Sequence, residues 1–185
     1  MIPPTASSAI PRRSGALMMV SIVLMLAGCA PTPEPTPTPT AAFASEEEAF
    51  AAAEETYRAF TAHLNEVDIA DPATFEPLFR LSSGDFEAAD RKAYSTMHAE
   101  GFVVDGDTKI VSFKGTEAIA PFHTVAAKVC LDVSAVTVTD SAGVSRVDPT
   151  RPDIYALDIV FAAENSTFTI DSASVDEEAM CAATS

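Results

Sequence analysis

The chain has 185 residues, of which 27 are acidic and 11 are lysine or arginine, so its formal net charge at neutral pH is −16. A negative surplus of this size repels phosphate backbones, and we therefore expect no nucleic acid among the partners of this protein. The length suits one domain with a substantial hydrophobic core and is short for two. No internal repeat divides the chain.

The first 28 residues have the layout of an export signal. Arg12 and Arg13 precede an apolar run over residues 15–27. As a helix this run spans about 20 Å, less than the roughly 30 Å hydrocarbon core of a bilayer, which favours a cleaved signal over a transmembrane helix. The paired arginines keep the twin-arginine route open beside general secretion. The four residues that close the signal, Leu26-Ala27-Gly28-Cys29, resemble the lipobox of bacterial lipoproteins.

The lipobox resemblance implies a lipid anchor. It predicts cleavage before Cys29 and a diacylglycerol on the Cys29 thiol, as in a Gram-positive, actinobacterial lipoprotein. The protein would then sit at the cell membrane on its extracytoplasmic face. Loss of Arg12 and Arg13 would leave 9 basic residues against 27 acidic ones, a formal charge of −18. The alternative is an ordinary secretory signal that is cleaved elsewhere and leaves Cys29 unmodified.

A stalk is predicted between the signal and the folded part, over residues 29–44. Residues 30–40 read APTPEPTPTPT, a composition with fixed proline φ angles and almost nothing to bury. We expect an extended spacer that could reach up to about 40 Å at roughly 3.1 Å per residue. The same residues would also suit an O-glycosylated segment. The folded part is then one domain over residues 45–185.

Helical signals come first in this domain. Ser45 and Glu48 have the spacing of a capping box, and Glu54 and Arg58 form an i,i+4 pair on the helix that follows. Asp71-Pro72 predicts a short second helix, and a third is predicted from Ser83 or Asp85 to Gly101. The apolar residues expected to face the core are Phe50, Ala53, Tyr57, Phe60 and Leu64, then Phe75, Leu78 and Phe79, then Phe86, Ala89, Ala93 and Met97.

After Gly101 the apolar period changes from 3.6 to 2. Residues 102–104 and 109–113 are predicted to form a hairpin across the turn Asp105-Gly106-Asp107. The longest strand is predicted over residues 125–139, with its odd positions facing the core. Strands over residues 153–161 and 167–175 follow. No crossover helix separates them, so the sheet is expected to be antiparallel.

Helices followed by such strands predict an α+β fold, with N-terminal helices packed on a curved antiparallel sheet. The order resembles the cone of the nuclear transport factor 2-like (NTF2-like) superfamily over residues 45–175, without a diagnostic motif. A cystatin-like arrangement is the alternative. Enzymes of that superfamily use polar groups inside the cone as general acids and bases. The resemblance therefore directs attention to inward His, Asp and Tyr side chains.

The chain has three cysteines. With Cys29 committed to lipid, Cys130 and Cys181 remain as an even pair outside the cytoplasm, and we expect a disulfide between them. Two separate thiols are the alternative. There is no CxxC, no HExxH and no clustered His/Cys spacing, so no metal and no other cofactor is expected.

Two residues are candidates for a pocket. His123 shares the odd phase of the long strand and is expected to face the helices near a cone mouth. Tyr57 lies on the core face of the first helix. His63 and His98 fall on helix flanks and are expected at the surface. The chain also lacks a G-x-S-x-G elbow, a P-loop and a dinucleotide fingerprint, so no catalytic residue is assigned.

Two classes of function are compatible with this pattern. The favoured one is a non-catalytic lipoprotein whose domain binds a small molecule or another envelope protein. The alternative is a cone-fold enzyme of isomerase, dehydratase or hydrolase type that acts on a small apolar substrate. A catalytic dyad in a lined cavity would favour the enzyme.

Overall fold

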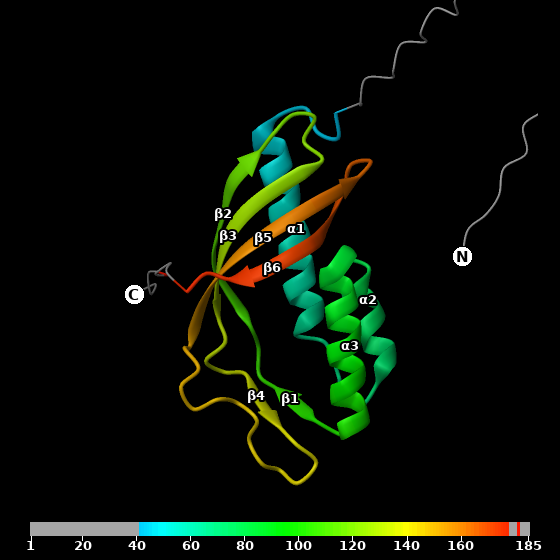
Figure 1. The fold of residues 1–185 in the computed structure, drawn as a ribbon, viewed down its shortest axis with the longest axis vertical. Helices are drawn as coiled ribbons and strands as arrows, with labels where there is room; N and C mark the ends of the chain where they lie inside the picture. The colour runs from blue at the N-terminus through cyan, green and yellow to red at the C-terminus, as the bar shows by residue number, and fades with distance from the viewer. Residues whose placement is uncertain (1–40, 178–180, 182–185) are drawn as a thin grey trace, which may run out of the picture. The chain divides into compact units, whose positions relative to one another are not determined.

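In the part of the chain that the structure describes, three α-helices precede the strands (Figure 1). The computed structural model describes residues 41–177 and residue 181, so the signal, the lipobox and nearly all of the stalk lie outside the described residues. The elements are α1 (Glu46–Leu64), the 3₁₀ helix η1 (Pro72–Phe75), α2 (Glu76–Phe79), α3 (Gly84–Glu100), β1 (Val103–Asp105), β2 (Lys109–Ala118), β3 (Thr124–Asp132), β4 (Thr137–Thr139), β5 (Ile154–Glu164) and β6 (Thr167–Val175). The predicted α+β fold is confirmed.

Helix α1 begins at the predicted cap. The backbone N–H of Glu48 donates to the Ser45 hydroxyl over 3.2 Å. The Glu48 carboxylate accepts from the N–H of Ala44 over 2.8 Å, one residue earlier than in the standard capping box. Glu54 and Arg58 form the expected ion pair, at 2.6 Å.

The short second helix is split in two. Asp71 caps η1 by accepting from the N–H of Ala73 over 3.0 Å. Pro77 lacks the N–H that a continuous α-helix would donate back to Ala73, so α2 starts anew at Glu76 with Pro77 in its first turn. Phe75, Leu78 and Phe79 are buried as predicted.

Helix α3 also has the predicted ends, but its predicted core face is right for Phe86 and Met97 and wrong for Ala89 and Ala93. It begins after Ser83 and stops at Gly101, whose φ of 68° is left-handed. Ala89 and Ala93 are exposed. The apolar and acidic residues that are partly buried are Phe86, Glu87, Asp90, Tyr94 and Met97. We call Phe86, Asp90, Tyr94 and Met97 the inner face of α3, because i,i+3 and i,i+4 spacing places them together.

Strands β2, β3, β5 and β6 form an antiparallel sheet in that order, next to α1 (Figure 1). The odd residues Val125, Ala127 and Val129 of β3 are at most 1% exposed, as predicted. Register shifts in β2, and between Val160 and Phe161 in β5, bend the sheet. Helix α1 approaches β2 so closely that a Cβ on Gly115 would lie 2.3 Å from the ring of Phe50.

One predicted strand pairing and one predicted strand end are wrong. Strand β1 pairs with β4, and β2 pairs with β3, so residues 102–104 and 109–113 do not form a hairpin. The predicted long strand also ends at Asp132 rather than at residue 139. A turn at Val133–Val136 separates it from β4, since the N–H of Val136 donates to the carbonyl of Val133 over 3.0 Å.

The folded domain includes residues assigned above to the stalk. Ala42 and Phe43 are each 8% exposed. The ring of Phe43 stacks on Phe168 with centroids 4.7 Å apart. The N–H of Ala42 donates to the carbonyl of Pro121 over 2.9 Å. The chain therefore enters the domain beside the β2–β3 connection.

Asp176 and Cys181 lie on the sheet face away from the helices. Cys130 and Cys181 form a disulfide with their Cα atoms 5.8 Å apart, consistent with the expected pairing. The N–H of Asp176 donates to the carbonyl of Ala156 over 2.8 Å. Lys128 pairs with Asp158 at 2.8 Å and also with Asp176. Over residues 41–177, no helix has the length and apolar character needed to cross a bilayer.

Candidate functional site

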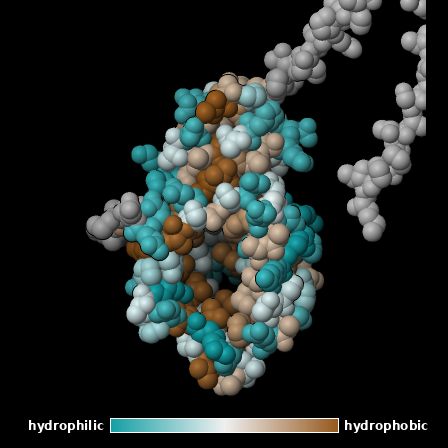
Figure 2. Space-filling view, viewed as in Figure 1, coloured by the Kyte–Doolittle hydropathy of each residue, from teal (hydrophilic) through white to brown (hydrophobic). Residues whose placement is uncertain are grey.

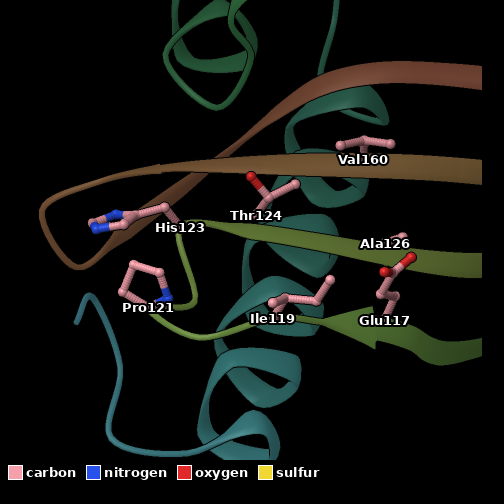
Figure 3. A pocket seen from close by; sticks show the side chains of 7 residues that line it. All are labelled: Glu117, Ile119, Pro121, His123, Thr124, Ala126 and Val160. Carbon is pink, nitrogen blue, oxygen red and sulfur yellow. The ribbon is translucent and has the colours of Figure 1, made fainter. Parts of the chain in front are cut away.

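A pocket of about 440 Å³ opens on the outer face of the sheet, and we call it the outer-face pocket. Thr124 and Ala126 alternate along β3 with the buried Val125 and Ala127, so the pocket lies on the side away from α1. Figure 3 shows its side chains on neighbouring strands and on the β2–β3 connection. The lining residues are Glu117, Ile119, Pro121, His123, Thr124, Ala126 and Val160.

The structure corrects the predicted direction of His123. Its side chain lines the outer-face pocket and does not face the helices. The residue before it, Phe122, has a left-handed φ of 63° and packs against the core. This conformation resets the alternation just before β3 begins at Thr124, so the odd phase of the strand does not extend back to His123.

Tyr57 lies in the core and does not line the outer-face pocket. It is 4% exposed, and its ring lies among Phe60, Phe113 and Phe161 at centroid distances of 6.2, 6.3 and 6.4 Å. Burial raises the pKa of its phenol, so the hydroxyl stays protonated. The two residues proposed from sequence for one pocket are thus on opposite sides of the sheet.

A second feature lies between α3 and β1. Figure 2 shows a hollow there with mainly apolar surface around it, in the space that Figure 1 places between these two elements. Helix α3 has no fully buried residue, although it contacts α2 and β6. Tyr94 and Met97 of its inner face, together with Phe102 and Val104, are partly buried around the buried cluster of Ile69, Phe75 and Phe79. The described residues therefore cover this inner face only in part.

The inner face of α3 carries one carboxyl group, that of Asp90. Desolvation raises the pKa of Asp90 to about 6 from its ordinary value of 3.8. Burial, and secondarily the charge of Asp90 one turn away, raises the pKa of the Tyr94 phenol. Within residues 41–177 the Asp90 carboxylate has no ion pair. The neighbouring cation, Arg91, binds Glu87 and Glu76 at 2.7 and 3.2 Å.

The chain's other two histidines have local partners. His63 lies 3.1 Å from the Glu66 carboxylate, and His98 lies 2.7 Å from the carbonyl of Ile69. Both were expected at the surface, and both are exposed or nearly so. Neither belongs to the inner face of α3. In the described part of the chain, no cluster of His, Cys, Asp and Glu has the arrangement of a metal site.

Asp90 is the residue that the sequence reasoning missed. The sequence does contain a signal for its position, because Phe86, Asp90 and Tyr94 follow one another at i,i+4 spacing and so share one face of the helix. The alanines at positions 89 and 93 suggested a different stripe, and a carboxylate at an inward position is uncommon.

Known proteins support the fold. The chain matches no known family profile and no curated protein. A putative aromatic ring hydroxylase from Novosphingobium aromaticivorans has a similar structure, with a TM-score of 0.51 and 10% identity over 71% of this chain and 90% of that one. The intermembrane space region of chloroplast protein ARC6 matches with a TM-score of 0.48 and 15% identity, over 68% of this chain and 95% of that one. Aln2 from a Streptomyces species matches with a TM-score of 0.44 and 14% identity, over 71% of this chain and 92% of that one.

At these identities the likeness concerns the fold alone. It supports helices packed on a curved antiparallel sheet, as in the NTF2-like cone. Such cones occur both in enzymes and in proteins without catalytic activity, so the function has to be argued from the residues of this chain.

Proposed function

We propose that this protein is a lipid-anchored extracytoplasmic lipoprotein whose domain binds a small apolar molecule in the hollow beside α3, without transforming it. The observation that carries the proposal is the inner face of α3, which is apolar except for Asp90 and only half-buried although the helix packs on its neighbours. A partly open apolar wall of this kind is stabilised when a ligand covers it.

The charge of the inner face supports binding over catalysis. Asp90 is its one carboxyl group, and Tyr94 is the nearest ionisable neighbour. General acid–base chemistry on a carbon substrate usually needs an oriented pair of groups with pKa values moved apart. Here burial raises the pKa of both groups in the same direction, so they do not form such a pair.

Binding to the hollow can be tested with Nile red, a neutral dye that fluoresces in apolar surroundings. We expect the full chain to enhance its emission. Asp90→Phe should reduce this enhancement at least about fivefold, because the ring fills space on the inner face, whereas Lys92→Phe, on the exposed face of the same helix, should leave it unchanged. Equal enhancement by both variants would contradict the proposal.

A cone-fold enzyme is the second candidate, and Asp90 favours it. A carboxyl group with a pKa near 6 is poised to take or give a proton at neutral pH. A substrate screen that finds turnover lost in Asp90→Asn, with the fold retained, would support this candidate over the binding module.

The anchor has its own test, because it rests on residues 26–29 alone. Intact-mass analysis of the membrane fraction should find diacylglycerol on Cys29. Cys29→Ala should release the protein or leave it unprocessed. Two acyl chains give stable retention where one gives weak binding. An unmodified Cys29 in the membrane form would show that the anchoring proposal is wrong.

A further inference from the structure

The outer-face pocket is separate from the hollow and plays no part in the function proposed above. Its wall is formed by aliphatic side chains of the neighbouring strands β3 and β5 and of the β2–β3 connection: Ile119, Pro121, Ala126 and Val160. Ile119 is 69% exposed, so its side chain is accessible for apolar contact with a ligand. The volume of about 440 Å³ falls in the range of small-molecule sites.

The polar groups of the pocket favour a ligand that donates hydrogen bonds. Glu117 is exposed and forms no ion pair within the described residues, and its carboxylate can only accept. The hydroxyl of Thr124 lines the pocket as a further acceptor. Lys and Arg are absent from the seven lining residues, so the carboxylate is the pocket's one fixed charge.

The arrangement separates the charge from part of the apolar wall. In Figure 3 Glu117 lies at one end of the row of side chains, His123 lies at the other, and Ile119 lies between them. A ligand that reaches along this row meets a negative charge at one end and aliphatic surface beyond it. The acidic surplus of the chain attracts cations over a longer range.

We propose that the outer-face pocket binds a small organic cation, an ammonium group carried on an apolar body. The ammonium group lies at Glu117, and the body covers Ile119, Ala126 and Val160. A carboxylate and an ammonium ion at an exposed site contribute up to about 1 kcal/mol, which corresponds to about fivefold in affinity.

Three probes of equal chain length separate charge from apolar contact: hexylammonium, hexanol and hexanoate. The isotope-labelled full chain with Cys29→Ser is titrated with each probe, and amide shifts at Thr124 and Ala126 report binding. We expect hexylammonium to bind about fivefold more tightly than hexanol, and hexanoate to bind most weakly. Ala126→Leu should weaken binding of hexylammonium and hexanol alike, since it fills the wall.

Glu117→Gln should remove the preference for hexylammonium over hexanol. The matched control is Glu164→Gln, the same change at an exposed carboxylate at the end of β5, outside this pocket. Equal affinity for the three probes would overturn the proposal, as would equal losses in the two glutamine variants, which would reflect net charge alone. A dimer in sedimentation that Ala126→Leu dissociates would also overturn it, because a second copy would then cover this face.

Discussion

The region where α1 meets the sheet and the region between α3 and β1 differ in how far they bury similar apolar residues. In the first, Val125, Val129 and Phe161 are completely buried. In the second, α3 has no fully buried residue, and Val103 of β1 is 58% exposed. The difference indicates that stability resides mainly in the α1–sheet region, whereas the α3–β1 region keeps surface available for a ligand.

The largest expected effect tests this division directly. Phe161→Ala should lower the free energy of unfolding by about 3–5 kcal/mol, because it leaves a cavity in a fully packed site. Met97→Ala removes a side chain of the half-buried inner face of α3 and should cost about 1–2 kcal/mol. Urea denaturation of both variants measures the contrast. Equal losses would mean that the two regions contribute alike.

The second effect concerns the Cys130–Cys181 bridge on the outer side of the α1–sheet region. The bridge closes a loop with a sequence separation of 51 residues. The chain-entropy relation gives about 4 kcal/mol for a loop of this length. Reduction, or Cys181→Ser, should lower the melting temperature and expose the chain beyond Val175 to proteases, with the helical circular dichroism retained.

Thiol labelling checks that the bridge is present in the isolated protein. Denatured, unreduced protein should show no free thiol at Cys130 or Cys181. Labelling of both would rule the bridge out.

The third effect is pH-dependent and belongs to the α3–β1 region. Because desolvation raises the pKa of Asp90 to about 6, the folded state holds this proton more tightly than the unfolded state does. The resulting stability is complete below the unfolded pKa, near 3.8, and is lost as the pH rises through 6. The full shift corresponds to about 3 kcal/mol. We expect about 1–2 kcal/mol, since the residue is partly exposed to solvent.

Asp90→Asn should therefore gain stability over the wild type between pH 4 and pH 7. Glu87→Gln is the control on the same helix, because Glu87 is paired with Arg91 and should not gain. Parallel pH profiles for wild type and Asp90→Asn would show that the carboxyl group is not desolvated.

The smallest effect is expected at the outer-face pocket. His123→Ala should change the free energy of unfolding by less than about 0.5 kcal/mol, because the side chain lies outside the core. It should also abolish no turnover. Activity that disappears in this variant at unchanged melting temperature would overturn the non-catalytic interpretation.

Local signals predicted the helices, because the causes of helix starts and stops are local. Ser45, Asp71 and Gly101 act on the backbone within a few residues, so their effect can be read without the rest of the chain. The prediction of a β1–β2 hairpin was wrong because the contacts that decide it are distant in sequence. Gly106 was taken as a turn glycine, but a Cβ there would lie 2.0 Å from the carbonyl oxygen of Ala135, a neighbour distant in sequence.

The candidate site was less predictable than the fold. The side of the sheet on which His123 lies depends on the left-handed backbone of Phe122, which no sequence pattern indicates. The inward position of Asp90 depended on which side of α3 its neighbours occupy. Both are decided by tertiary contacts, which periodicity alone does not specify.

The way in which the chain enters the domain also fixes how a mechanical load would be carried. Any pull on residues before Ala42 reaches the stack of Phe43 on Phe168 before it reaches α1. The same pull is shared by the hydrogen bond from Ala42 to Pro121 and by the one from the Ser166 hydroxyl to the Ala42 carbonyl, at 2.9 and 3.0 Å. These contacts join the leading end of the domain to the connections β2–β3 and β5–β6. Drag on a tethered domain would thus be spread over two hairpins of the sheet, and the α3–β1 region would be spared the strain.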